Sequence, residues 1–409
     1  MTVAAASEDR LEVSRQEIED LAAELGHVFY LVDLDRIKEH HDDLLAAFRG
    51  RYPKTVLAYS VKTHYTPRVL ALIRELGSMA EVVSEMEYDI ASRVGFASGE
   101  IMVNGPLHED AFLEKILLQG VRINLDGGYM LDTLHRLSRA HPGRRFRVGL
   151  RLNYAIPGAD WSRFGFATDA RALRRLAGWF EAHENCELVG LHSHFPLAPH
   201  DAGTFRARLE GLVRAAREGF PGVRLEYLDL GGGFRRHPAD PPVGGAPEAV
   251  AAILRESFAA AERPTLYVEP GTAVVASAVA FVCRVYDVKR VGGRTLALTN
   301  GSNHHINTMM WHTGFDVRTV RTGGDEPAAE VFDVVGNTCM ERKDLICSGV
   351  AGPVARGDYL VFHGVGAYSS ALKPPFIHPC PAIVARRGGR YEVVKRRETV
   401  DDVLRTFEL

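Results

Sequence analysis

A single lysine, Lys62, follows a short apolar run and is placed where it could carry carbonyl chemistry. The run Val56-Leu57-Ala58-Tyr59 is typical of a buried strand, and a helix-like segment begins at Pro67, so we expect Lys62 at the carboxyl end of a strand. Desolvation there favours the neutral amine, which is the form that condenses with an aldehyde. On this stretch alone, a lysine that merely extends its ammonium group to solvent is an equal alternative.

Two further elements place chemistry directly after strand-like runs. Gly231-Gly232-Gly233 follow Leu228-Asp229-Leu230, and consecutive residues without a Cβ atom let backbone amides approach a phosphate closely. Glu269 ends the run Tyr267-Val268-Glu269 and can hold the nitrogen of a pyridine ring in its protonated form. A plain glycine turn and a salt-bridged or solvent-facing glutamate are the ordinary alternatives.

His192 and His194 alternate along another strand-like run, so their side chains point to the same face. Such a pair can ligate a metal ion, but we find no matching third ligand, because Glu81 and Asp126 are too generic to count. We therefore predict no metal site. A flat imidazole stacked on an aromatic cofactor is the alternative that also fits Lys62 and Glu269.

These residues lie at the ends of eight strand-like runs that alternate with helical or polar segments. The runs are Val56–Lys62, Met79–Ser84, Glu100–Gly105, Arg122–Asp126, Arg147–Asn153, Glu187–Phe195, Leu225–Gly232 and Thr265–Gly271. The alternation predicts an α/β fold, a (β/α)8 TIM-like barrel whose active site lies at the carboxyl ends of the strands. An open doubly wound sheet shows the same alternation and remains the alternative.

After Gly271 the pattern changes to short β-rich segments separated by glycine turns. We predict that residues 28–272 form the barrel and that residues 273–409 form a C-terminal all-β domain, a sandwich or barrel. Residues 1–27, a tail and a helix, are assigned to the β domain. The run at residues 28–32 opens the barrel in this division, although it can equally join the β domain.

Composition restricts the class of protein. The chain has 409 residues, 46% of them hydrophobic, and a formal net charge of -3, so no basic block points to nucleic acid or to an anionic membrane. No apolar run approaches the ~20 residues of a membrane span. The start, Met1 to Ser14, does not fit a signal peptide. The cysteines form no C-x-x-C pair, and we predict a cytoplasmic protein without disulfides; they are Cys186, Cys283, Cys339, Cys347 and Cys380.

Taken in order, the motifs resemble those of the fold-type III pyridoxal-phosphate-dependent decarboxylases. This family includes diaminopimelate, ornithine and arginine decarboxylases and relatives in siderophore and antibiotic pathways. The resemblance spans roughly residues 28 to 400. It rests on Y-x-V-K-x at Tyr59–Thr63, H-x-H at His192–His194, L-D-x-G-G-G at Leu228–Gly233, E-P-G at Glu269–Gly271, G-x-x-C at Gly336–Cys339 and G-A-Y at Gly366–Tyr368.

The resemblance implies roles for the barrel residues. Lys62 is similar to the lysine that holds pyridoxal 5'-phosphate as an internal aldimine. His194 is similar to the residue stacked on the pyridine ring, and Glu269 to the partner of its nitrogen. The resemblance also implies cofactor contacts from the glycines and from one tyrosine of the β domain, which are Gly231, Gly232, Gly233, Gly271 and Tyr368.

The resemblance implies a head-to-tail homodimer with shared active sites. Cys339 is similar to the cysteine that comes from the other subunit and can donate a proton. Glu341, Asp344 and Tyr368 are candidate substrate contacts, although the spacing from Cys339 to Asp344 is one residue longer than usual. The implied reaction converts an L- or D-amino acid, or an amino-acid conjugate, to the amine and CO2.

Departures from the family pattern bear on the substrate. Thr272 stands where an arginine usually follows E-P-G, and Phe195-Pro196-Leu197 replace a glycine and serine after the stacking histidine. The segment Asn303–Asn307 replaces an arginine-bearing motif. Because the second carboxylate of diaminopimelate must be neutralised, these losses disfavour that substrate. We expect a specialised member of siderophore or other secondary metabolism.

Two rival functions stay open at this point. An amino-acid racemase shares the barrel and the lysine, but it would use an arginine at the ring nitrogen, which Glu269 disfavours. A non-catalytic, decarboxylase-like regulator would have lost cofactor binding. Lys62 and Glu269 argue against that alternative, whereas Thr272 and Phe195-Pro196 keep it open.

Overall fold

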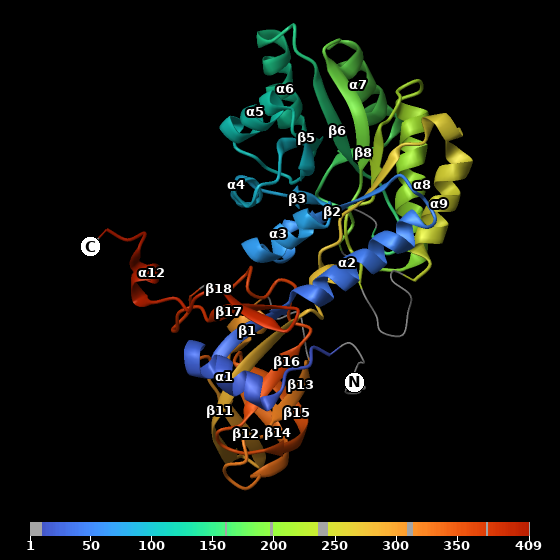
Figure 1. Ribbon diagram of the computed structural model, residues 1–409. Coiled ribbons are helices and arrows are strands. Elements are labelled where there is room, and N and C mark those ends of the chain that lie inside the picture. Colours follow the sequence, from blue (N-terminus) through green and yellow to red (C-terminus); the bar gives the residue numbers. More distant parts are fainter. Residues whose placement is uncertain are drawn as a thin grey trace. The chain divides into compact units, whose positions relative to one another are not determined.

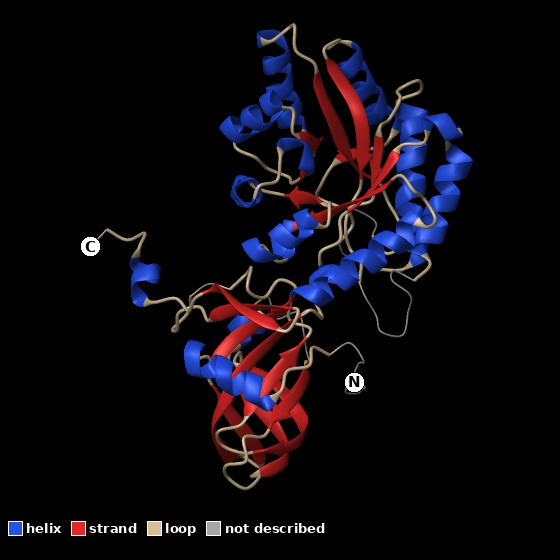
Figure 2. Ribbon diagram, in the orientation of Figure 1, coloured by secondary structure: helices blue, strands red, loops and turns tan. Residues whose placement is uncertain are grey.

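The computed structural model describes residues 10–159, 162–196, 199–235, 244–308, 314–373 and 375–408. The chain divides into two compact units. Lys38–Ala273 forms the first, here called the barrel unit. Val274–Leu409 joins the N-terminal residues up to Ile37 to form the second, here called the β unit. Figure 1 follows the chain through both units, and Figure 2 shows that helices dominate the first and strands the second.

Eight parallel strands of the barrel unit close into a ring. They are β2 (Thr55–Ser60), β3 (Met79–Val82), β4 (Ile101–Val103), β5 (Arg122–Leu125), β6 (Phe146–Asn153), β8 (Cys186–His192), β9 (Tyr227–Asp229) and β10 (Thr265–Val268). Hydrogen-bonded neighbours run in the order β5-β4-β3-β2-β10-β9-β8-β6, and pairing of β5 with β6 closes the sheet. The short β7 (Phe166–Ala167) pairs with β6 outside the ring. The predicted barrel is confirmed, and the open sheet is excluded.

Amphipathic helices follow the strands and surround the ring (Figure 2). They are α2 (Leu34–Arg49), α3 (Pro67–Glu75), α4 (Glu85–Val94), α5 (Asp110–Gln119), α6 (Gly128–Ala140), α7 (Ala170–Glu181), α8 (Ala202–Gly219) and α9 (Ala246–Ser257). Ser84, Asp169 and Asp201 cap α4, α7 and α8 by accepting backbone N–H bonds, which fixes where those helices begin. Within the described part of the chain, no helix is both long and apolar enough to cross a membrane.

A polar column occupies the interior of the barrel. Tyr227 donates its hydroxyl to Asn124 Oδ1 at 2.7 Å, and Asn124 Nδ2 donates to Asn104 Oδ1 at 2.9 Å. Gly149 and Gly190 make room for the tyrosine, because a Cβ atom at Gly190 would lie 2.1 Å from its ring and one at Gly149 2.2 Å from its hydroxyl. The column leads from the middle of the barrel to the carboxyl ends of its strands.

The β unit contains a mixed sheet of nine strands. They are β1 (Val28–Asp33), β11 (Val279–Val291), β12 (Arg294–Thr299), β13 (Asp316–Val320), β14 (Ala329–Val335), β15 (Leu345–Val354), β16 (Tyr359–His363), β17 (Ala382–Arg387) and β18 (Arg390–Lys395). The order is β15-β14-β12-β11-β1-β17-β18, with β16 paired to β11 and β13 to β16. The helices are α1 (Arg15–Leu25), α11 (Asn303–Ile306) and α12 (Val400–Leu404), and α10 (Thr272–Val275) lies where the units join along the chain.

The strand β1 corrects the division that places the start of the barrel at residue 28. It pairs antiparallel with β11, Val28 opposite Cys283, and parallel with β17, Phe29 opposite Ala382. All six of its residues are buried. A short apolar run that is buried on both faces has the same pattern in either sheet, so the sequence could not assign it. The helix expected within residues 1–27 is present as α1.

Candidate active site

Lys62 lies at the carboxyl end of the barrel strands, in the 3-10 turn Val61–Thr63 that follows β2. The strand expected to run to Lys62 therefore ends at Ser60. The lysine Nζ lies 2.7 Å from Ser60 Oγ and 2.7 Å from Glu81 Oε2. Glu81 is 1% exposed and the lysine side chain is 33% exposed. A buried carboxylate thus holds an amine that solvent, and hence a carbonyl compound, can reach.

A continuous series of polar contacts connects Lys62 with Glu269, which follows β10. Asn104 Nδ2 donates to Glu81 Oε1 at 3.2 Å and also to Glu269 Oε1. The other oxygen of Glu269 lies 3.6 Å from His192 Nε2. Asn104, Glu81, Glu269 and His192 are all buried, so the low-dielectric surroundings strengthen these contacts and fix the side chains.

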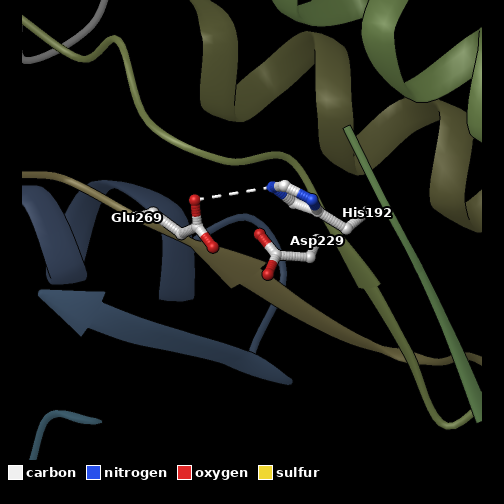
Figure 3. Close-up of side chains that lie close together, drawn as sticks. All are labelled: His192, Asp229 and Glu269. Atoms are coloured by element: carbon white, nitrogen blue, oxygen red, sulfur yellow. Dashed lines mark ion pairs between the residues drawn. The ribbon is translucent and has the colours of Figure 1, made fainter. Parts of the chain in front are cut away.

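His192, Asp229 and Glu269 converge from the ends of β8, β9 and β10. Figure 3 shows the three side chains pointing toward one another, and their candidate ligand atoms lie within 4.8 Å of each other. This arrangement corrects the expectation that the histidines lack a matching third ligand, because Asp229 and Glu269 both reach His192. Partners so distant in the sequence could not be recognised from spacing.

The charges in this cluster suit a protonated ring nitrogen as a ligand. Burial, together with the charge of Glu269, raises the pKa of Asp229 well above its ordinary value. Burial would also raise the pKa of Glu269, but His192 and Lys62 hold it below its ordinary value. The pair is therefore one carboxylic acid and one carboxylate. Glu269 can therefore accept a hydrogen bond from a protonated ring nitrogen.

The glycine loop after β9 cannot carry side chains. Gly231 and Gly233 have φ angles of +64° and +95°, which favour glycine. A Cβ atom at Gly231 would lie 2.7 Å from His194 Cβ, and one at Gly232 would lie 2.6 Å from the carbonyl oxygen of Glu269. The loop therefore packs directly against the histidine and the glutamate. Its bare backbone suits a bound phosphate.

His194 follows β8 and is half-buried beside this loop. Its Nδ1 accepts the N–H of Gly232 at 3.2 Å. Burial, reinforced by the charges of Arg151 and Arg208, lowers the pKa of His194 well below its ordinary value, so the imidazole is neutral at pH 7. A neutral flat ring in this place is suited to stacking.

Gly271 allows the loop after β10 to pack onto the lysine turn. A Cβ atom at Gly271 would lie 2.0 Å from Thr63 Oγ1, the residue next to Lys62. Ser60 N–H also donates to the carbonyl of Pro270 at 3.1 Å. The E-P-G motif is therefore required for the position of the lysine as well as for that of Glu269.

The barrel residues suit a phosphorylated pyridine aldehyde. They offer an amine for the carbonyl, a carboxylate for the ring nitrogen and a bare glycine loop for the phosphate. Among the described residues, buried polar atoms also lack hydrogen-bond partners here, namely both ring nitrogens of His192 and Asp229 Oδ2. Such atoms in a native protein mark a place where a ligand completes the bonding.

Several residues of this site were not predicted as site residues. Asp229 lies inside the L-D-x-G-G-G motif, and Asn104 ends a predicted strand, so the sequence could have marked both as site residues. Arg151 gives Asp126 a role, because its Nη1 lies 3.3 Å from Asp126 Oδ2 and its Nη2 donates to the carbonyl of His194 at 3.2 Å. Arg208 lies inside a helix, and no sequence feature marks it as a site residue.

The remaining predicted residues belong to the β unit and so are not members of the barrel cluster. Cys339 and Glu341 are exposed in the loop between β14 and β15. Tyr368 is half-buried and has a φ angle of +58°, which is uncommon for a residue with a side chain. Exposure leaves Cys339 and Glu341 accessible to a ligand or to another subunit.

Asp344, by contrast, is 4% exposed, and its carboxylate is used locally. One oxygen accepts from Ser302 Oγ at 2.8 Å and from Asn303 N at 2.9 Å. The other accepts from Thr338 N at 2.8 Å and from Thr338 Oγ1 at 2.7 Å. These bonds indicate that Asp344 organises the loop that presents Cys339, and they leave little capacity for a substrate.

Comparison with known proteins agrees with this chemistry. Residues 34–276 match the family model "Pyridoxal-dependent decarboxylase, pyridoxal binding domain". Diaminopimelate decarboxylase of Methanothermobacter thermautotrophicus is 29% identical over 94% of this chain and 92% of its own length. The Deinococcus radiodurans enzyme of the same name is 28% identical over 96% of this chain and 99% of its own length.

Solved structures share the fold. Diaminopimelate decarboxylase from M. jannaschii in complex with L-lysine has a TM-score of 0.84 at 20% identity and covers 95% of this chain and 94% of its own. SrLDC in complex with PLP and cadaverine has a TM-score of 0.74 at 20% identity, with coverage of 93% and 95%. The family model spans more than half of the chain. The chain therefore belongs to the pyridoxal-dependent decarboxylases, and it is a carboxy-lyase that acts on an amino acid with pyridoxal 5'-phosphate as cofactor.

Proposed function

We propose that the enzyme removes the α-carboxyl group of an amino acid or amino-acid conjugate as CO2 and that Lys62 binds the aldehyde carbon of the cofactor. The observation that carries this proposal is the series of contacts from Lys62 through Glu81 and Asn104 to Glu269. It places an amine and a ring-nitrogen partner in one rigid network at the active end of the barrel. When bound, the cofactor accepts the electron pair that remains on Cα as CO2 departs.

Glu269 controls the proton on the pyridine nitrogen. Its lowered pKa keeps it ionised, so it accepts a hydrogen bond from a protonated ring rather than donating one to a neutral ring. Asn104 orients the carboxylate by donating to it, and Asn124 orients Asn104. The neutral His194 can stack on the ring without placing a second cation against it.

Lys62 must lose a proton before its amine can attack a carbonyl carbon. Glu81 and Ser60 lie at hydrogen-bond distance from its Nζ, and Ser60 Oγ also donates to Glu81 at 2.7 Å. This triangle gives the proton two acceptors during the exchange. Glu81 is thus proposed to hold the proton, and Ser60 to orient both groups.

We also propose a homodimer in which Cys339 acts as the proton donor to Cα and in which Glu341 and Tyr368 contact the substrate. Cys339 and Glu341 are exposed on a loop that Asp344 anchors, which supports a role outside their own unit. The scattered cysteines, all of them free, fit the predicted cytoplasmic location.

The proposed substrate is a specialised amino acid rather than diaminopimelate. The two diaminopimelate decarboxylases compared above are 29% and 28% identical to this chain, which has Thr272 after E-P-G. Asn303, in the segment that replaces the arginine-bearing motif, donates its side-chain amide to the carbonyls of Lys343 and Leu345. That asparagine is therefore used structurally and adds no charge for a distal carboxylate.

An absorption spectrum tests the role of Lys62. Full-length protein reconstituted with pyridoxal 5'-phosphate should show the visible band of a lysine-bound pyridoxal group, and borohydride should bleach it. Lys62→Ala should lack this band, whereas Lys54→Ala, at an exposed lysine of the same unit, should keep it. A band of wild-type intensity in Lys62→Ala would assign the aldehyde to another residue.

Release of CO2 from a panel of substrates tests the specificity. The panel contains diaminopimelate, lysine, ornithine, arginine and their N-acylated or otherwise conjugated forms, each in both enantiomers. We expect the highest kcat/KM with a conjugated amino acid. Turnover of free diaminopimelate at ordinary enzymatic rates, on the order of 1–10³ s⁻¹, would remove the specialised-substrate proposal and leave the decarboxylase intact.

A further inference from the structure

Arg208 in α8 is a buried cation without a counter-ion. Its relative exposure is 0%, and among the described residues it forms no ion pair. Its guanidinium instead donates to three backbone carbonyls, of Gly232 at 2.7 Å, Phe195 at 2.9 Å and Leu230 at 3.4 Å. Its Nε has no partner in the described structure.

The second buried arginine of the barrel unit shows the usual arrangement. Arg151 also donates to a backbone carbonyl, but its guanidinium lies 3.3 Å from the carboxylate of Asp126. A buried charge without a paired partner is strongly unfavourable. Burial lowers the pKa of Arg208 only to about 10, so the side chain remains charged at pH 7. The charge of Glu269 acts on Arg208 from beyond ion-pair distance, so the guanidinium can still take a bound anion as its partner.

The contacts of Arg208 point to where that anion binds. The carbonyl of Gly232 and the N–H of Gly233 belong to one planar peptide and point in opposite directions. By holding the carbonyl, the guanidinium aims the Gly233 N–H away from itself. A Cβ atom at Gly233 would lie 3.0 Å from His200 Nδ1 and 3.5 Å from Arg208 Nη2, so the bare backbone of the loop packs against both side chains.

We propose that Arg208 supplies the positive charge of the cofactor's phosphate subsite and acts as a positioning residue through the Gly232–Gly233 peptide. This inference rests on the proposed role of the glycine loop. Thr272, after E-P-G, offers only a hydroxyl, and Arg235, just beyond the loop, is exposed. The buried arginine therefore gives the loop a fixed, desolvated charge, which attracts a phosphate dianion more strongly than an exposed one.

The test compares two ligands that differ only in the phosphate. Full-length wild type and Arg208→Met, both freed of cofactor, are titrated with pyridoxal 5'-phosphate and with pyridoxal, and Kd is measured by fluorescence. We expect Arg208→Met to weaken binding of pyridoxal 5'-phosphate roughly 10- to 100-fold, the range of a charge-assisted hydrogen bond. The Kd of pyridoxal should change by less than about threefold, within the effect of a neutral substitution.

Matched variants separate charge from structure. Arg206→Met, on the same helix at an exposed position paired with Glu210, should leave both affinities unchanged. Arg235→Met tests the rival cation and should have a smaller effect than Arg208→Met. An equal loss of affinity for both ligands in Arg208→Met would show a merely structural role and overturn the inference, as would an unchanged affinity for the phosphorylated ligand.

A second measurement tests the proposal if Arg208→Met does not fold. Inorganic phosphate, which can fill the subsite alone, should raise the Tm of the cofactor-free wild type more than that of Arg208→Gln, since glutamine keeps an amide donor but carries no charge. Equal rises would overturn the inference. If the wild type bound neither pyridoxal nor its phosphate ester, the proposed site itself would fail, and that result is distinct from a failure of Arg208 alone.

Discussion

Asp229 in the barrel unit and Asp344 in the β unit are both buried aspartates beside a glycine-bearing loop, but their oxygens are used differently. Asp344 accepts four hydrogen bonds, two on each oxygen. Asp229 accepts the N–H of Gly231 on one oxygen, and in the described structure its other oxygen has no hydrogen-bond partner. The Asp229 carboxylate belongs to the cluster with Glu269 and His192.

The difference separates an acid that stabilises from an acid that is available for chemistry. A carboxylate with every lone pair engaged by its own loop gains stability and has little left to offer a ligand. An incompletely bonded acid held next to a second carboxylate keeps a perturbed pKa, which is the property of functional sites. Burial alone therefore did not distinguish these two aspartates, whereas their hydrogen bonds do.

The sharpest test of this comparison is Glu269→Gln, which has the largest expected effect. Glutamine keeps the size of the side chain and an acceptor for Asn104, but it cannot hold the ring nitrogen protonated. We expect kcat for CO2 release to fall roughly 10²- to 10³-fold at saturating cofactor, as for loss of one preorganised electrostatic group. The Tm should stay close to that of the wild type. Wild-type kcat in this variant would remove Glu269 from the mechanism.

Asp344→Ala should show the opposite profile. Removing the acceptor of four hydrogen bonds should lower the free energy of unfolding by about 2–4 kcal/mol, measured by urea denaturation. Pyridoxal 5'-phosphate affinity should be retained. Glu341→Ala, at an exposed position of the same loop, is the control and should change stability by less than about 0.5 kcal/mol. A stable but inactive Asp344→Ala would instead assign this aspartate to the substrate.

A smaller effect concerns the pH dependence of the barrel unit. Burial, with a contribution from the charge of Glu81, raises the pKa of Glu87 from 4.5 to about 7. The folded state then holds a proton that the unfolded state releases, so stability falls as pH rises from about 4.5 to about 7. The loss of stability over this range is at most about 3.4 kcal/mol. The Tm of Glu87→Gln relative to wild type should therefore increase over this range, and a constant difference would contradict the assignment.

The stability of the β unit should change with pH in the opposite direction. His363 is buried without hydrogen-bond partners among the described residues, and burial lowers its pKa from 6.5 to about 4. The unfolded state binds the proton more tightly, so stability falls as pH falls from about 6.5 to about 4. By calorimetry, the Tm of His363→Phe minus that of the wild type should increase as the pH decreases. An increase of this Tm difference toward high pH would mean that the ring is charged in the folded state.

The barrel could be predicted because its signals are local. Each strand is a short apolar run that ends in a polar residue or glycine, and the rim residues Lys62, His194 and Glu269 stand at those ends. The sequence signal of helix α1 is also local, because a capping box between Ser14 and Glu17 marks where the helix begins.

The remainder depends on contacts that the sequence does not encode locally. Asn104 meets Glu269 across 165 residues, and Arg208 gives no signal because an arginine inside a helix is ordinary. The strands β13 and β15 were not predicted. In β15, Gly349 and Gly352 adopt φ angles of +69° and +121° and interrupt the alternation that marks a strand.

The membership of β1 in the β unit bears on the order in which the chain folds during synthesis. Asp33, at the end of β1, is bonded to Arg386, which is 353 residues later. The ribosome therefore makes this central strand first, and its two neighbours, β11 and β17, only after the whole barrel. All eight barrel strands, in contrast, lie in one uninterrupted stretch between them. We expect the barrel to form while the chain is still being translated, and β1 to remain unpaired until β11, and later β17, emerge.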